Sequence, residues 1–180
     1  RFRREGLLLG RLNHPRIARL LDAGMHVETH QPYLVLEFVD GLAIDAWCES
    51  QALDARRRIA LFLQVIEAVA HAHSHLIIHR DLKPSNVLVT TQGNVKLLDF
   101  GIARLASGDD RALHTRSSVA AMTPQYAAPE QVQGGLITTR TDVYALGLVL
   151  YRLLTGRHAV ELDANASAEM FRTILEREPP

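Results

Sequence analysis

The stretch His79-Arg80-Asp81-Leu82-Lys83-Pro84-Ser85-Asn86, followed by Asp99-Phe100-Gly101, decides the fold of this 180-residue chain. Between these two stretches, apolar runs at 87–89 and 95–98 flank Thr91-Gln92-Gly93-Asn94, a pattern that predicts a β-hairpin. The outer ends of hairpin strands lie side by side. The two polar stretches that border the hairpin are therefore expected to meet in the folded chain.

Three polar side chains in these stretches are expected to converge at the open end of the hairpin: Asp81, Asn86 and Asp99. Two carboxylates and an amide form an all-oxygen site suited to Mg²⁺, a hard cation that also favours phosphate oxygens. The pattern therefore predicts a phosphoryl-transfer centre. A purely structural role for all three together is disfavoured.

The composition is that of a soluble globular protein, because 47% of the residues are hydrophobic, 22% are charged, and 20 basic side chains balance 20 acidic ones. This excludes disorder and a fibrous repeat, and the chain is long enough for one core. The balanced charge does not favour nucleic acid as a partner. The single cysteine, Cys48, cannot form an internal disulfide and is expected to be buried.

No membrane segment or signal peptide is expected in this chain, since its longest apolar run, residues 143–151, is shorter than the roughly 20 residues that span a bilayer. We therefore expect a cytoplasmic location. The chain begins inside a helical pattern and ends at Pro179-Pro180, so we expect it to be an excerpt of a longer protein.

The first part of the chain predicts one helix and two strands. Helical spacing of apolar residues over 2–12 predicts a helix that carries Glu5 and ends at Asn13-His14-Pro15. Short strands are expected at 17–21 and 33–39, with a turn at Asp22-Ala23-Gly24. Asp40-Gly41 is expected to end the second strand.

The remainder predicts helices separated by one long loop. Asp54 is expected to cap a helix whose apolar face is Ile59, Phe62, Leu63, Ile66, Val69, Ala70 and His73. Residues 142–154 predict a helix buried on all sides and stopped by Gly156, and a weaker helix is expected over 167–175. Residues 104–124 lack periodicity and predict a regulated or substrate-facing loop.

The histidines near the end of the first long helix allow two interpretations. His71 and His75 lie one turn apart and could share a metal ion, whereas a structural role is favoured. Trp47 is expected in the core or at a contact between lobes.

The two stretches quoted first, together with Ala128-Pro129-Glu130, occur in the order typical of protein kinases. The chain resembles Hanks-type Ser/Thr protein kinases over essentially its whole length. The sequence of its motifs is similar to that of bacterial members. The resemblance implies an α+β, two-lobed, protein-kinase-like fold. Residues 1–39 would be a small-lobe remnant, and residues 40–180 an incomplete large lobe.

The resemblance also implies catalytic roles for residues in the quoted motifs. Asp81 would orient the substrate hydroxyl and accept its proton, and Lys83 would neutralise charge on the transferred phosphoryl. Asn86 and Asp99 would hold Mg²⁺ against the phosphates of ATP. Thr123 would lie against Asp81 and Lys83 and favour Ser or Thr acceptors in a protein substrate.

The resemblance also implies residues that line the nucleotide pocket and residues that hold the active conformation of the family in place. Glu37 and Val39 match the hinge that binds adenine through its backbone, Leu36 the gatekeeper, and Leu88 the apolar floor. Glu5 matches the glutamate that pairs with an ATP-positioning lysine. The apolar stack that links the two lobes in the family is matched by Leu9, Leu20, His79 and Phe100. Asp142 matches the acidic residue that anchors the backbone of the 79–81 loop.

Regulation by phosphorylation is implied by Arg80, whose guanidinium could pair with a phosphate on the long loop. Thr115 and Ser117 are the expected phosphate acceptors. Self-phosphorylation is thus one expected partner reaction, beside transfer to other proteins.

The chain departs from the family pattern in lacking a glycine-rich loop and a strand lysine. It contains only two lysines, Lys83 and Lys96, and Lys96 is expected to face away from Asp99. Met122 and the run His158-Ala159-Val160 are smaller departures. We attribute the missing parts to truncation, and expect this chain alone to bind ATP weakly, to transfer little phosphate and to expose apolar residues at 34–39.

Two functional classes stay open at this point. The first is an ATP-dependent protein Ser/Thr kinase. The alternative is a catalytically silent kinase-like module that binds partners through the same cleft. A small-molecule kinase of related fold is disfavoured by the motif at 123–130.

Overall fold

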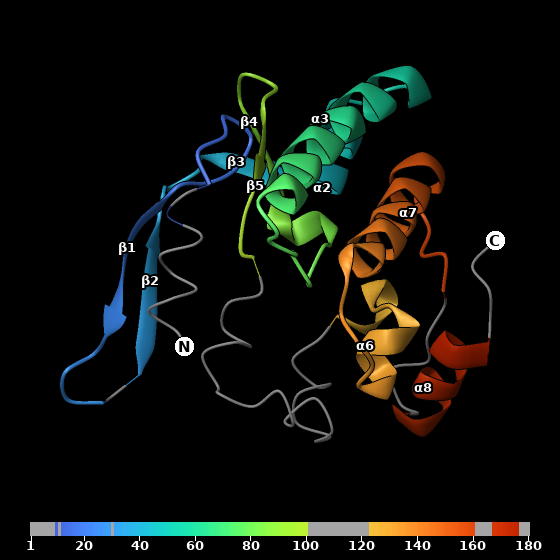
Figure 1. Ribbon diagram of the computed structural model, residues 1–180. Coiled ribbons are helices and arrows are strands. Elements are labelled where there is room, and N and C mark those ends of the chain that lie inside the picture. Colours follow the sequence, from blue (N-terminus) through green and yellow to red (C-terminus); the bar gives the residue numbers. More distant parts are fainter. Residues whose placement is uncertain (1–9, 11, 30, 101–122, 161–166, 177–180) are drawn as a thin grey trace.

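The computed structural model describes residue 10 and residues 12–29, 31–100, 123–160 and 167–176. Figure 1 shows two small sheets beside a group of helices. The elements in chain order are β1 (Leu20–Met25), β2 (Pro32–Leu36), β3 (Gly41–Ala43), α2 (Ile44–Ser50), α3 (Ala55–Ser74), η1 (Pro84–Asn86), β4 (Val87–Thr90), β5 (Val95–Leu97), η3 (Pro124–Tyr126), α6 (Pro129–Gln133), α7 (Thr139–Thr155) and α8 (Ser167–Glu176). This confirms the expected α+β class.

The two sheets are antiparallel and are connected through the segment before β1. β1 pairs with β2, and β4 lies between β3 and β5. Ile17 forms a parallel bridge with Leu97, and the N–H of Ala18 donates to the carbonyl of Leu97 at 2.9 Å. The chain leading into β1 is therefore hydrogen-bonded to β5.

The hairpin prediction at 87–98 is confirmed by β4 and β5. Gly93 has φ +79° in the turn, a conformation that glycine adopts without a steric penalty. β3 adds a third strand that the sequence analysis did not predict. The absence of a side chain at Gly41 permits its close approach to β4, since a Cβ at this position would be 2.6 Å from the carbonyl oxygen of Val89.

The prediction of a turn at Asp22-Ala23-Gly24 was wrong, because these residues lie inside β1. Gly24 is opposite Tyr33 on β2, and the tyrosine ring occupies the space next to its Cα: a Cβ there would be 2.5 Å from the hydroxyl oxygen. Glycine thus serves cross-strand packing, and the chain turns after Met25. β2 also ends at Leu36, earlier than the predicted strand.

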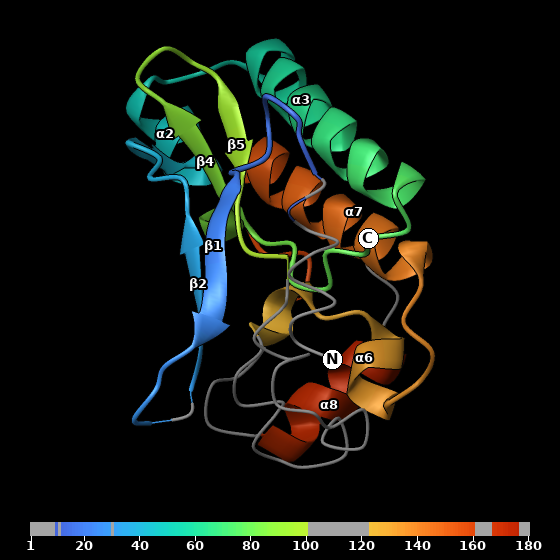
Figure 2. The ribbon, with the colours of Figure 1, turned by 60° about the vertical axis from the view of Figure 1, so that its left-hand side comes forward.

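The long helix α3 begins as predicted, with the side chain of Asp54 accepting a hydrogen bond from the N–H of Arg57 at 2.8 Å. Its predicted apolar face was partly wrong. Ile59, Leu63 and Ile66 are exposed. The buried positions are Leu61, Phe62, Val65, Ala68, Val69 and Ala72. Small residues on this face allow close packing against α7, which lies beside α3 in Figures 1 and 2.

Helix α7 confirms the helix predicted over 142–154 and is followed by Gly156, whose φ of +72° is typical of a helix stop. Its core-facing side includes Ala145, Leu148 and Leu153. The expectation of burial on all sides was wrong, because Val143 and Leu154 are exposed.

Two smaller predictions concern α2, a helix that the sequence analysis did not predict. Cys48 on this helix is fully buried, and burial raises the pKa of its thiol. Trp47 packs against the same core. Both residues thus take the expected core role. Helix α8 agrees with the helix expected over 167–175.

The helix predicted over 2–12, including Glu5 and Leu9, and most of the loop predicted over 104–124 lie outside the described residues. Within the described part of the chain, no helix combines the length and the apolar character needed to cross a membrane.

Candidate active site

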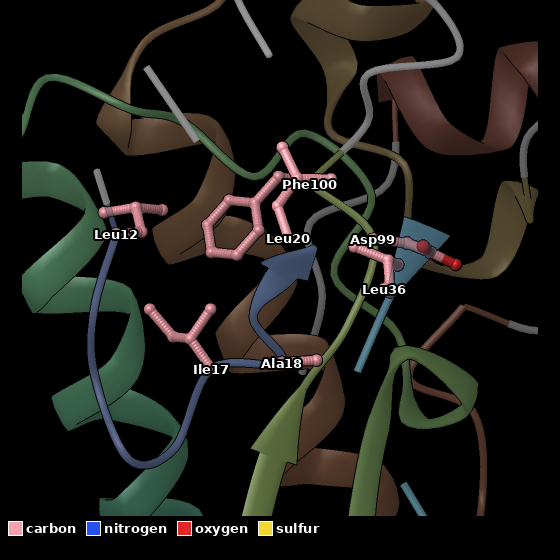
Figure 3. Close-up of a pocket in the computed structure, with 7 residues that line it drawn as sticks. All are labelled: Leu12, Ile17, Ala18, Leu20, Leu36, Asp99 and Phe100. Atoms are coloured by element: carbon pink, nitrogen blue, oxygen red, sulfur yellow. The ribbon is translucent and has the colours of Figure 1, made fainter. Parts of the chain in front are cut away.

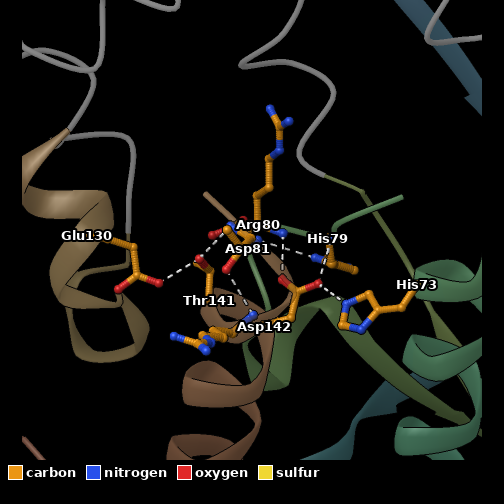
Figure 4. Close-up of polar contacts among 9 residues, drawn as sticks. His73, His79, Arg80, Asp81, Glu130, Thr141 and Asp142 are labelled. Atoms are coloured by element: carbon orange, nitrogen blue, oxygen red, sulfur yellow. Dashed lines mark hydrogen bonds and ion pairs between the residues drawn. The ribbon is translucent and has the colours of Figure 1, made fainter. Parts of the chain in front are cut away.

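The loop that contains His79, Arg80 and Asp81 is anchored from below by Asp142, a buried residue in the first turn of α7 (Figure 4). One oxygen of the Asp142 carboxylate accepts the backbone N–H of His79 at 2.8 Å, and the other accepts that of Arg80 at 2.9 Å. The first oxygen also accepts a hydrogen bond from Nε2 of His73 at 2.7 Å. Three donors thus compensate the burial of this carboxylate.

His79 connects this loop to the strand that leads to Asp99. Its Nε2 lies 2.7 Å from the carbonyl oxygen of Leu98 and must donate, while its Nδ1 accepts the N–H of Asp81 at 3.3 Å. This pattern requires the neutral ring with hydrogen on Nε2. Burial lowers the pKa of His79 and favours that form, although the nearby Asp142 carboxylate opposes the shift.

The side chains of Asp81, Lys83 and Asn86 form a connected group at the end of β4. Nζ of Lys83 lies 2.8 Å from Oδ2 of Asp81. The Nδ2 group of Asn86 donates to the same oxygen at 3.1 Å and to the backbone carbonyl of Asp81 at 2.8 Å. Asn86 is buried, so these bonds fix the orientation of the Asp81 carboxylate.

Asp99 is brought to the same end of the hairpin through its neighbour Leu98, whose N–H donates to the carbonyl of Asn86 at 2.8 Å. Asp99 has φ +42° and an exposed side chain. Within the described residues, its carboxylate makes no hydrogen bond or ion pair, and the side-chain oxygen of Asn86 accepts none. Both oxygens are thus available to a cation.

An apolar pocket lies behind Asp99 and is lined by Leu12, Ile17, Ala18, Leu20, Leu36 and Phe100 (Figure 3). The ring of Phe100 is buried, and its centroid lies 4.8 Å from that of His79. The structure thus brings together Leu20, Phe100 and His79, three members of the predicted apolar stack.

The predicted hinge residues follow β2. The carboxylate of Glu37 lies 2.7 Å from Nζ of Lys96 and also accepts the backbone N–H of Arg19 at 3.1 Å. The hydrogen bond from Lys96 lowers the pKa of Glu37. The backbone of Val39 forms no hydrogen bond with the other described residues. Leu88 is half-buried and pairs with Lys96 across the hairpin.

The remaining predicted site residues have no described contact with the side chains of Asp81, Lys83 and Asn86. Thr123 immediately precedes η3, and no hydrogen bond between the described residues joins it to Asp81 or Lys83. Glu5, Thr115 and Ser117 lie outside the described residues. The guanidinium of Arg80 extends away from its contacts with Asp142 in Figure 4.

Three functional contacts had no interpretable signal in the sequence. His73 was expected on the apolar face of its helix, but it binds Asp142. Lys96 was expected only to face away from Asp99, but it pairs with the hinge. Gln131 was not predicted at all, yet it is buried and hydrogen-bonded to Arg80. Each partner is distant in sequence, so only the fold reveals these pairs.

The histidines His14, His71 and His75 form a stack, with ring centroids 4.8 and 4.5 Å apart. The metal interpretation of His71 and His75 gains no support, because the described residues contain no group of three or more His, Cys, Asp or Glu side chains arranged to hold a metal.

Comparison with known proteins identifies the class. The protein kinase domain family matches residues 1–178. The chain therefore belongs to the protein kinase domain family, and the resemblance noted in the sequence is confirmed.

Individual relatives are bacterial Ser/Thr protein kinases. The chain is 37% identical over 181 residues to the serine/threonine-protein kinase PrkC of Bacillus subtilis, covering 100% of this chain and 27% of PrkC. It is 40% identical over 160 residues to PknB of Mycolicibacterium smegmatis, covering 87% of this chain and 25% of PknB. It is also similar to Pkn1 of Myxococcus xanthus, with 39% identity over 184 residues, covering 100% of this chain and 26% of Pkn1. The chain spans about a quarter of each of these relatives.

Proposed function

We propose that the protein is a Ser/Thr protein kinase and that this chain carries its phosphoryl-transfer site. The observation that carries the proposal is the group formed by Asp81, Lys83 and Asn86, in which a carboxylate is held by an ammonium and a buried amide. The named relatives, all Ser/Thr kinases, support the same activity.

In this proposal, Asp81 orients the hydroxyl group of a Ser or Thr acceptor and receives its proton as the bond to phosphorus forms. Lys83, 2.8 Å from Asp81, is close enough to neutralise negative charge on the transferred group. The bond between Asn86 and Asp81 keeps the carboxylate aimed without rearrangement. Thr123 would contribute to the choice of acceptor.

The oxygen atoms at this end of the hairpin fit Mg²⁺ and ATP as cofactor and substrate. Asn86 and Asp99 would hold the cation, which neutralises phosphate charge when bound. Their side-chain oxygens accept no hydrogen bond from any described residue, and this supports the assignment, since Mg²⁺ is commonly held by one or two protein oxygens together with phosphates and water.

The adenine ring would bind at the hinge. The backbone of Glu37 and Val39 would supply hydrogen bonds, with Leu36 behind the ring and Leu88 below it. The backbone of Val39 has no hydrogen-bond partner among the residues that the structure describes, which supports this assignment. We further propose that residues 1–39 belong to the small lobe and 40–180 to the large lobe. A cytoplasmic location and self-phosphorylation at Thr115 or Ser117 belong to the same proposal.

A catalytically silent binding module is the second candidate, and one observation favours it. The chain has two lysines, and both are engaged, Lys83 with Asp81 and Lys96 with Glu37. Within this stretch of the protein, neither lysine is therefore available to replace the ATP-positioning lysine of the family. For the same reason we expect this chain by itself to bind ATP weakly.

Transfer of labelled γ-phosphate from ATP to casein by the full-length protein tests the proposal. Asp81→Asn should lower kcat by roughly 10²- to 10⁴-fold, the usual contribution of a positioned acid or base. Asp22→Asn, the same chemical change at an exposed site on β1, should leave kcat unchanged. Absence of transfer by the unmodified protein, with partner binding retained, would favour the silent module.

A further inference from the structure

The side chain of Gln131 on α6 connects two segments that the proposed mechanism treats separately. It is 5% exposed. Its Nε2 group donates to the backbone carbonyl of Arg80 at 2.7 Å, and its Oε1 atom accepts the backbone N–H of Ala128 at 3.0 Å. A side-chain amide carries an N–H₂ donor and a carbonyl oxygen acceptor on one carbon atom. In Gln131 both the donor and the acceptor are used.

The carbonyl bound by Gln131 belongs to the peptide group that joins Arg80 to Asp81. The N–H of this peptide group donates to Nδ1 of His79 at 3.3 Å. The preceding peptide group donates the N–H of Arg80 to Asp142 at 2.9 Å. Because a peptide group is planar, bonds at both of its ends fix the plane from which the Asp81 side chain projects.

The backbone of Arg80 needs such support, because its φ of +70° lies in the left-handed region that non-glycine residues rarely adopt. Such a conformation persists when the surrounding structure holds it in place. Asp142 holds the N–H of Arg80 and Gln131 holds its carbonyl, so two buried side chains from different helices restrain one residue.

We propose that Gln131 is a positioning residue that aims Asp81 and couples it to the segment at 123–128. This inference rests on the proposed kinase function. Through Ala128, the amide connects the catalytic loop to the segment that begins at Thr123, which the proposed function assigns to acceptor binding. A shift of one segment is therefore transmitted to the other.

The most informative variant is Gln131→Glu in the full-length protein. The introduced carboxylate still accepts the N–H of Ala128, but it cannot donate to the carbonyl of Arg80. We expect kcat for transfer to casein to fall roughly 10- to 100-fold at about pH 8, since small misplacements of a reacting group have effects of this size. The KM for ATP should change by less than about threefold, because the hinge is untouched.

Acidification should partly reverse this loss. Burial raises the pKa of the introduced carboxyl group, and its protonated form again donates to Arg80. The ratio of variant to unmodified kcat should therefore rise between about pH 8 and about pH 6. Gln131→Met, which has neither donor nor charge, should lose activity without this recovery. Gln133→Glu, the same change at an exposed position of α6, is the matched control and should match the unmodified protein.

Folded Gln131→Glu and Gln131→Met variants that keep kcat within about twofold of the unmodified protein at about pH 8 would overturn the inference. Equal losses in kcat for both variants at all pH values would also overturn it. Faster amide exchange at Arg80 and Asp81 in Gln131→Met is expected even if phosphate transfer fails in the unmodified protein. That last result would remove the proposed function while leaving the positioning contact intact.

Discussion

The imidazole of His73 and the carboxylate of Asp142 are joined by a hydrogen bond of 2.7 Å although the residues lie 69 positions apart. The bond connects the last turn of α3 to the first turn of α7. The same carboxylate accepts the backbone N–H groups of His79 and Arg80. The packing of two helices and the shape of the loop at residues 79–81 therefore depend on one buried side chain.

Replacing Asp142 should be strongly destabilising. Asp142→Asn removes the charge and turns an amide N–H₂ group towards one of three donors. We expect a loss of about 3 kcal/mol in the free energy of unfolding, since bonds to buried charges are worth more than neutral ones. Urea denaturation measures this loss. His75→Phe, at an exposed position of the same region, should change stability by less than about 0.5 kcal/mol. Equal stability of both variants would contradict the assigned role.

The buried side chain of His79 should make stability depend on pH. Burial lowers the pKa of His79 below its ordinary value of 6.5, so the unfolded chain binds more protons below that pH. Its contribution to stability is thus complete above about pH 6.5 and decreases towards the folded pKa, by at most about 1.4 kcal/mol per pH unit. Urea denaturation at several pH values in this range should show a smaller change of the free energy of unfolding with pH, the slope in question, for His79→Phe than for the unmodified protein. An unchanged slope would contradict the prediction.

The pair formed by Lys96 and Glu37 should contribute a small, measurable coupling. Both side chains are partly exposed, so we expect a coupling energy of about 1 kcal/mol or less. A double-mutant cycle with Lys96→Met and Glu37→Gln measures it directly. The pKa of Glu37 is lowered by Lys96, so this stabilisation should be present above the ordinary pKa of 4.5 and lost as the pH falls through the folded value. A coupling that is unchanged at acid pH would contradict this explanation.

Two glycines should respond to alanine in opposite directions. In Gly41→Ala, the new methyl group would lie 2.6 Å from the backbone oxygen of Val89, which cannot move without breaking the pairing of β3 with β4. We expect a loss of about 1–3 kcal/mol. Gly147 lies on the exposed side of α7, and apart from its chain neighbours and the backbone of its own helix, no atom of the described residues lies within 4 Å of the new position. Gly147→Ala should therefore stabilise by about 0.5–1 kcal/mol. Thermal denaturation compares the two; destabilisation by both would show that the space around Gly147 is smaller than described.

Local patterns in the sequence predicted those elements whose structure depends on neighbouring residues. The capping of α3 by Asp54, the hairpin with Gly93 and the end of α7 at Gly156 each follow from short-range sterics and hydrogen bonding. The meeting of Asp81 with Asn86 also followed, because the hairpin dictates where its ends lie.

Other features could not be predicted because they depend on what packs against an element. Gly24 had the signature of a turn, but Tyr33 on the next strand makes it a packing residue. Helix α3 offered more than one apolar stripe, and the stripe that includes Ala68 and Ala72 is buried in a fold where α7 and β5 both contact this helix. Periodicity defines which residues share a face, but it does not state which face is covered.

The sequence by itself determined the family, the hairpin and the acids beside it, because these depend on residues close together in the chain and on three ordered motifs. Only the tertiary structure decided that His73 binds Asp142, that Gln131 binds Arg80 and that Lys96 binds Glu37. Their partners are distant in sequence, and a buried hydrogen bond forms only where packing brings a donor and an acceptor within about 3 Å.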